Sequence, residues 1–237
     1  MDSAKTAAGR GETPNADCGR KTQSPEPGPA AAGQTAPARR RKQRGSELVE
    51  FALAVSVLVP LLAGSVAAGL NLARSVQVIQ VCRDAGHMYS RGVDFSDAAN
   101  KALIERLAQG LDIRVAGGSG VVILSTILFI GPDQCAAGGV SANSCTNLNQ
   151  PVFTKRIVIG NGAARQSSFG APPAALLDGS GNVSNYLTNA GARASAFNSV
   201  LALQPGDMAY VAETYVPSAD YSFLGQANSG VYSRTIF

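Results

Sequence analysis

The sequence predicts an α+β protein in which a long N-terminal transmembrane helix continues into an amphipathic helix, packed on a mostly antiparallel β-sheet extracytoplasmic domain. Residues 51–73 carry no charge, and apolar residues then recur at helical spacing. After residue 110, β-branched and aromatic segments alternate with Gly, Pro and Asn. We therefore expect a disordered basic tail, a transmembrane helix, a helical stalk and a β-rich domain at residues 1–45, 46–73, 74–110 and 111–237.

The tail, residues 1–45, contains no Leu, Ile, Val, Phe or Tyr. Such a segment cannot bury enough apolar surface to offset the entropy that ordering costs, about 1–2 kcal/mol per residue. Its nine basic and four acidic residues give it a charge of +5, which leaves about −1 on the remainder, given the total of +4. The positive charge therefore belongs to the tail, and a nucleic-acid-binding domain is not indicated.

The uncharged run of residues 51–73 is long enough, at about 1.5 Å per residue, to cross a hydrocarbon core of about 30 Å. A buried helix of a soluble protein is the alternative, but such helices are usually shorter and amphipathic. A cluster of basic residues flanks only the N-terminal side of the run: Arg39, Arg40, Arg41, Lys42 and Arg44. Positive flanks stay in the cytoplasm, so we expect a single-pass bacterial inner-membrane protein with its C-terminal domain outside.

A cleaved secretory signal is a competing interpretation of the same run, because Val66, Ala67 and Ala68 could form a small-residue cleavage site. The long preceding tail argues against it. The helical pattern also continues beyond Ala68.

Within the run, Pro60 removes one backbone hydrogen bond and is expected to kink the helix. Gly64 and Ala68, and likewise Ser65 and Gly69, place small residues four apart on neighbouring faces. Small faces permit close helix packing. Generic transmembrane composition explains these residues equally well.

Beyond the run, apolar residues continue at helical spacing from Val76 toward Met88, and Gly92 ends the pattern. A second helix is expected over residues 94–109, with Ser96 as its N-cap and Gly110 as its stop.

Strand-like segments follow the second helix, and residues 163–193 are expected to form a long loop. The expected strands are Ile113–Val115, Val121–Ile130, Val152–Gly160 and Met208–Val216. The sequence therefore predicts a sheet backed by the long helix.

Cys135 and Cys145 bracket a loop rich in Gly, Ser, Ala and Asn, and in an oxidising compartment they are well placed to form a disulfide. Metal binding is the weaker alternative, since no His or second Cys pair lies nearby. Cys82, on the helix beyond the membrane, is either a packed residue or an intermolecular partner. Cys18 is expected to be cytoplasmic and reduced.

Catalytic signatures are missing from the sequence. His87 is the single histidine, and no nucleophile elbow, phosphate loop or zinc signature occurs. Gly117, Gly118 and Gly120 precede a strand, as in a turn, whereas a phosphate-binding loop opens a helix. The sequence therefore predicts a non-enzyme with no catalytic residues, no metal and no cofactor.

The membrane boundary carries a more specific pattern. It reads Arg44-Gly45-Ser46-Glu47-Leu48-Val49-Glu50-Phe51-Ala52-Leu53 and leads into the hydrophobic helix. This pattern resembles the N-terminus of TadE-like pseudopilins of the tight-adherence (Tad/Flp) pilus system. Gln204–Asp207 and the expected closing strand Gly230–Phe237 resemble the C-terminal part of that family more loosely, whereas the centre of the chain and the long tail depart from its pattern.

The resemblance implies that a prepilin peptidase cuts after Gly45, which frees Ser46 as the new N-terminus and leaves Glu50 at the fifth position, before Phe51. A carboxylate at the start of an apolar helix is favoured by the helix dipole and would seek a positive partner, such as the freed amine of a neighbouring subunit. Alternatively, Glu50 caps the interfacial helix of an unprocessed protein.

Two functional classes follow from these observations. The first is a minor pilin or pseudopilin that helps to build a Tad-type adhesion pilus, with other pilin subunits, the inner membrane, the prepilin peptidase and the pilus assembly machinery as partners. The second is a membrane-tethered envelope binding or scaffolding module that never enters a filament.

Overall fold

The computed structural model of the protein describes residues 44–217 and 230–237. The chain divides into two compact units, residues 1–51 and 52–237. The predicted disordered tail, Cys18 and the basic residues Arg39, Arg40, Arg41 and Lys42 lie outside the described residues. The predictions made for them therefore remain predictions.

Helix α1 spans Arg44–Ser90, and its residues 44–51 belong to the first unit. The predicted long apolar helix is thereby confirmed. The helix continues through Pro60 without interruption. It ends where predicted, because Gly92 adopts a φ of 87°, a left-handed conformation that favours glycine.

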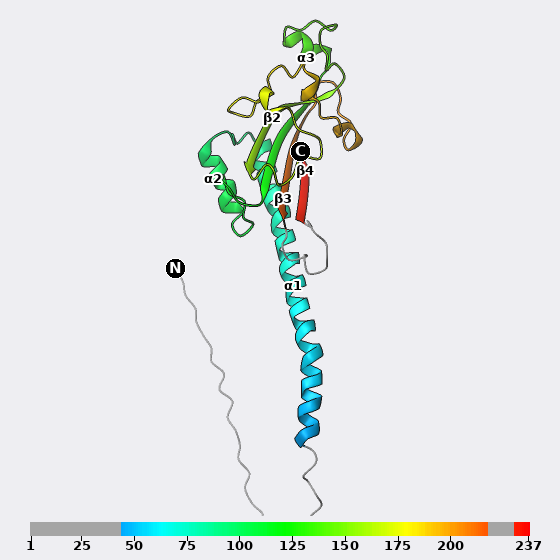
Figure 1. Ribbon diagram of the computed structural model, residues 1–237. Helices are drawn as coiled ribbons and strands as arrows, with labels where there is room; N and C mark the ends of the chain where they lie inside the picture. The colour runs from blue at the N-terminus through cyan, green and yellow to red at the C-terminus, as the bar shows by residue number, and fades with distance from the viewer. Residues whose placement is uncertain (1–43, 218–229) are drawn as a thin grey trace, which may run out of the picture. The chain divides into compact units, whose positions relative to one another are not determined.

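Four antiparallel strands form one open sheet in the order β2-β1-β3-β4 (Figure 1). The strands are β1 (Val121–Phe129), β2 (Pro151–Gly160), β3 (Met208–Pro217) and β4 (Gly230–Ile236). These bounds lie close to the predicted ones. The expected strand Ile113–Val115 is wrong, because Ile113 makes only an isolated bridge to Gly118 across a tight turn.

The second helix is shorter than predicted. Helix α2 spans Ala98–Leu107, and its N-cap is Asp97, whose carboxylate accepts the amide of Ala99 at 2.9 Å. Ser96 is not the cap, because the carboxylate of Asp94 accepts both its amide and its hydroxyl in a separate turn. Gly110, with a φ of 93°, follows the helix end as expected.

One face of the sheet packs against the C-terminal part of α1 and against α2 (Figure 1). The α1 residues in this first core are Val78, Val81, Cys82, Ala85 and Tyr89. Apart from the adjacent pair Val81 and Cys82, they recur at spacings of three or four, so they form one stripe of the helix. Opposite them lie sheet residues of the same face: Val122, Leu124, Ile157, Ile159, Ala212 and Val216.

The other face of the sheet is covered by two connections, which hold a second core. The β1–β2 connection contains the short helix α3 (Pro132–Ala137), and the β2–β3 connection contains the 3-10 turns η1 (Ala174–Leu176), η2 (Ala190–Ala192) and η3 (Phe197–Ser199). The second connection also lies along the outer edge of β2, where the amide of Arg156 donates to the carbonyl of Gly181. The predicted long loop is therefore a packed layer of the domain.

Candidate functional site

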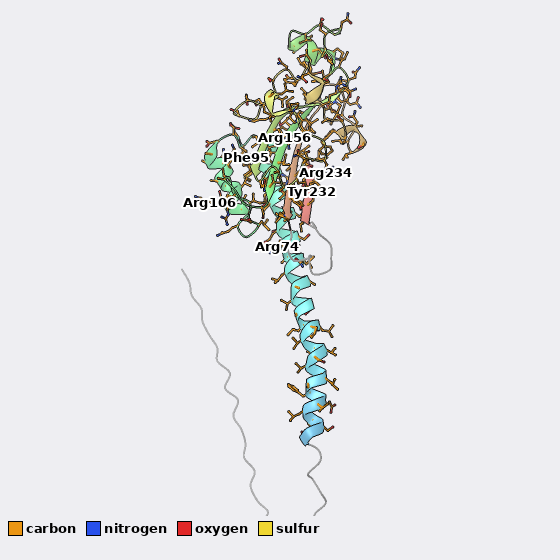
Figure 2. All side chains as sticks on the ribbon, viewed as in Figure 1. Arg74, Phe95, Arg106, Arg156, Tyr232 and Arg234 are labelled. Carbon is orange, nitrogen blue, oxygen red and sulfur yellow. A yellow bond between two sulfur atoms is a disulfide. The ribbon has the colours of Figure 1, made fainter. Side chains whose placement is uncertain are left out.

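The N-terminal part of α1 exposes large apolar side chains, and Figure 2 shows them projecting from the helix on both sides. The exposed fractions range from 55% at Val66 to 71% at Leu48. The exposed residues are Leu48, Val49, Phe51, Leu53, Val57, Leu58, Val59, Leu61, Leu62, Val66, Leu70 and Leu72. Soluble proteins rarely leave so large an apolar surface in water. By length and composition, α1 could cross a membrane.

The predicted processing residues lie together in the first turns of α1. Gly45, Ser46 and Glu50 are all exposed, and Phe51 exposes 68% of its surface. Glu47 is the acid of the first turn, one turn before Glu50, and the helix dipole favours negative charge there. This end of the helix is therefore accessible in the described part of the chain.

The small residues of α1 leave an open surface. A Cβ atom added at Gly64 or Gly69 would meet nothing within 4 Å, and Ala68 is exposed. The nearby hydroxyl of Ser65 donates to the carbonyl of Leu62 at 2.8 Å. A hydroxyl satisfied within its own helix can face lipid or another helix without leaving an unpaired donor.

Beyond Arg74, α1 changes character, because one face becomes buried. Cys82 is buried, and its thiol donates to the carbonyl of Ala212 at 3.3 Å, as expected of a packed residue. His87 is exposed, with its ring centroid 4.5 Å from that of Phe237. The contacts of Cys82 and His87 just described do not pair either side chain with a group that could act with it in catalysis.

The predicted disulfide is confirmed between Cys135, on α3, and Cys145, with a Cα–Cα distance of 6.1 Å. The segment that directly follows Cys145 is tied to the β2–β3 connection by Asn147, which is fully buried. The Asn147 amide donates to the carbonyls of Tyr186 and Asn189, and its oxygen accepts from Arg193 Nε, each at 2.7 Å. The disulfide is therefore part of a fixed cap over one end of the second core.

A buried carboxylate that the sequence analysis did not single out lies on β3. Glu213 exposes 2% of its surface, and its Oε1 accepts the hydroxyl of Tyr232 at 2.6 Å and the amide of Ser168 at 2.9 Å. In the sequence, Glu213 could have been recognised as the single acidic residue inside a strand of mostly apolar and small residues. Glu213 thereby connects β3, β4 and the β2–β3 connection.

Arg156 on β2 lies on the same face of the sheet and exposes 8% of its surface. Burial lowers the pKa of its guanidinium, and the charge of Glu213 acts in the opposite direction. In the register of the sheet, Arg156 is opposite Ser125 and Glu213 is opposite Ile123. Arg156 Nε, Ser125 Oγ and Glu213 Oε2 have no hydrogen-bond partner among the described residues.

Two arginines cover this face with their guanidinium groups. Arg165 stacks over Tyr232 and Tyr215, 4.1 and 5.3 Å from the ring centroids, and Arg234 lies 4.8 Å from the centroid of Phe169. Cation–π contacts of this kind hold a connection against a sheet. Glu213, Arg165 and Arg234 therefore join the edge strand and the connection to the sheet.

In the part of the chain that the structure describes, no three His, Cys, Asp or Glu residues are grouped so that they could hold a metal ion. The most distinctive surface is thus the exposed apolar helix with the accessible residues at its start. Comparison of the chain with protein-family models, with curated proteins and with solved structures gave no match.

Proposed function

We propose that this chain is a minor pilin or pseudopilin, a structural or assembly component of a Tad-type adhesion pilus, anchored in the inner membrane by residues 51–73. The observation that carries the proposal is the apolar part of α1, exposed around the helix and preceded directly by Arg44-Gly45-Ser46-Glu47-Leu48-Val49-Glu50-Phe51. That pattern resembles the start of TadE-like pseudopilins.

A membrane is the environment that accounts for the exposed apolar surface. At about 25 cal/mol per Å² of apolar area, keeping these side chains in water would cost many kcal/mol. The basic residues before Gly45 orient the helix with its N-terminus in the cytoplasm and the β-rich domain on the extracytoplasmic side.

Processing after Gly45 would free the amine of Ser46 and leave Glu50 near the start of the helix. In a filament, the carboxylate of Glu50 would pair with a freed amine of a neighbouring subunit, because a charge in an apolar environment requires a partner. The open faces at Gly64 and Gly69 would allow a neighbouring helix to approach closely.

The N-terminal sequence and intact mass of the protein isolated from its own membranes test this proposal. A start at Ser46 supports it. An intact Met1 would favour the membrane-tethered module, and a start at Gly69 would indicate secretion. Gly45→Leu should block the cut, because a large side chain would replace the glycine next to the cleaved bond. Gly69→Leu is the matched control and should be processed normally.

Filament association separates a pilus component from a tethered module. Glu50→Gln should still be cut after Gly45 but should lose co-purification with sheared pili, because the charge that pairs with the neighbouring amine is gone. Glu47→Gln, which removes an acid one turn earlier, should retain co-purification. Equal recovery of both variants with the filaments would contradict the role assigned to Glu50.

A further inference from the structure

The turn that follows α2 lies beside the apolar part of α1. A groove of about 590 Å³ is lined by Gly110 and by α1 residues Ala67, Leu70, Ala73, Arg74 and Gln77. Leu70 and Ala73 belong to the uncharged run, and Arg74 is the first charged residue after it. Gly110 therefore lies at the level where the apolar run ends.

Leu107 lies beside the next turns of α1. A second groove, of about 260 Å³, is lined by Leu107, Gln109 and Leu111 together with Gln77, Gln80, Val81 and Asp84. At about 1.5 Å per residue, residues 77–84 lie roughly 6–17 Å beyond Ala73 along the helix. The polar layer of a bilayer is about 5–8 Å thick on each side. Of these α1 residues, Gln77 lies within that layer, whereas Gln80, Val81 and Asp84 lie beyond its outer boundary. The turn thus extends from the outer boundary of the layer, at Leu107, inward to Gly110.

The side chains of this segment suit a membrane surface. Leu107 and Val115 expose 43% and 42% of their surface, and Leu103, one turn earlier in α2, exposes 40%. The basic residues Arg106 and Arg114 are exposed among them, although Arg114 Nε lies 3.2 Å from Oδ1 of Asp112 in the same segment. Figure 2 shows Arg106 on α2 and Arg74 on α1. Apolar side chains flanked by arginines are typical of segments that lie in the headgroup layer.

We propose that residues 107–115 lie on the outer surface of the membrane that α1 crosses, with Gly110 among the headgroups, Leu107 at their outer boundary and Arg106 facing lipid phosphates. The proposal rests on the proposed function in one respect, that residues 51–73 span a bilayer. Continuity with the apolar run favours lipid over a protein partner, because the groove at Gly110 opens beside Leu70, which is itself exposed. This contact would fix the height and tilt of the β-rich domain above the membrane.

The chain contains no tryptophan, so one introduced tryptophan reports on one position. The full chain is reconstituted in vesicles of phosphatidylethanolamine and phosphatidylglycerol that contain lipids quenching either at the headgroup or at mid-chain. Leu107→Trp is expected to be quenched severalfold more by the headgroup label than Ala137→Trp. Ala137 is an exposed residue of α3, beyond the opposite end of β1. Val115→Trp provides a second probe of the same turn.

Leu58→Trp, inside the apolar run, tests the anchor separately and is expected to be quenched by the mid-chain label. If Leu58→Trp is quenched and both turn probes match Ala137→Trp, the turn proposal is overturned and the anchor stands. If Leu58→Trp escapes both labels, the anchor itself is wrong. A blue-shifted but unquenched Leu107→Trp would show that protein covers the turn, and would also overturn the proposal.

Discussion

The hydroxyl of Tyr232 on β4 donates a 2.6 Å hydrogen bond to Oε1 of Glu213 on β3, and both groups also contact Ser168 of the β2–β3 connection. Because Glu213 is buried, its carboxylate cannot exchange these donors for water without opening the structure. The edge strand, its neighbour and the covering connection are therefore held at one point.

Tyr232→Phe should lower the free energy of unfolding by about 1–3 kcal/mol, because it removes a hydrogen bond to a buried charged group. The measurement is denaturant unfolding of the full chain in detergent micelles. Combining Tyr232→Phe with Glu213→Gln in a double-mutant cycle should give a coupling of at least about 0.5 kcal/mol. Strictly additive effects would show that the two side chains act independently.

Because Tyr89 is buried, the free energy of unfolding is expected to depend on pH in the alkaline range. Burial raises the pKa of its hydroxyl from 10.0 to about 12, while the hydrogen bond with Thr126 acts in the opposite direction. The unfolded state loses this proton near pH 10, whereas the folded state keeps it to about pH 12. The stabilisation is thus fully present below pH 10 and is lost as the pH rises through 12.

The unfolding free energy of Tyr89→Phe should therefore fall less between pH 10 and about 12 than that of the unaltered protein. Tyr232, whose pKa is also raised to about 12 by burial and by Glu213, leaves part of the decline in place. Unfolding curves at stepped pH values provide the measurement. An equally steep decline in the variant would contradict the assignment.

The disulfide should contribute about 2–4 kcal/mol, mainly by restricting the unfolded chain. Replacing Cys135 and Cys145 with Ala should lower the unfolding free energy by that amount and abolish any effect of reductant. Cys82→Ala keeps the bond and should retain the response to reductant. A reductant-sensitive double variant would mean that other cysteines form the bond in solution.

The close packing around Gly86 leaves no room for a larger side chain at this position of α1. A Cβ atom at this position would overlap the ring of Phe237 and lie 3.0 Å from Cβ of Ala212. Gly86→Val should therefore lower the unfolding free energy by about 1–3 kcal/mol, because overpacking forces the helix away from the sheet. Gly69→Val, with nothing within 4 Å, is the matched control. Similar losses for both variants in thermal unfolding would point to helix propensity instead of packing.

Most of the fold followed from local patterns. The strands β1, β2 and β3 were predicted within two residues, because β-branched runs bounded by turn residues favour extended backbone whatever lies beside them. The cap of α2 was missed, since Asp94, Ser96 and Asp97 are all capable caps and the turn at Asp94 decided between them. The expected strand at Ile113–Val115 was missed because a strand requires a partner, which composition does not supply.

The sequence by itself determined the uncharged run of α1, its basic N-terminal flank, the Cys135–Cys145 pair and the order of helices and strands, because each depends on neighbouring residues or on composition. Only the tertiary structure decided that Glu213, Tyr232 and Ser168 meet, and that Gly110 lies beside Leu70. These contacts join residues far apart in the chain. They depend on strand register and on the packing of α1 and α2, which no local pattern encodes.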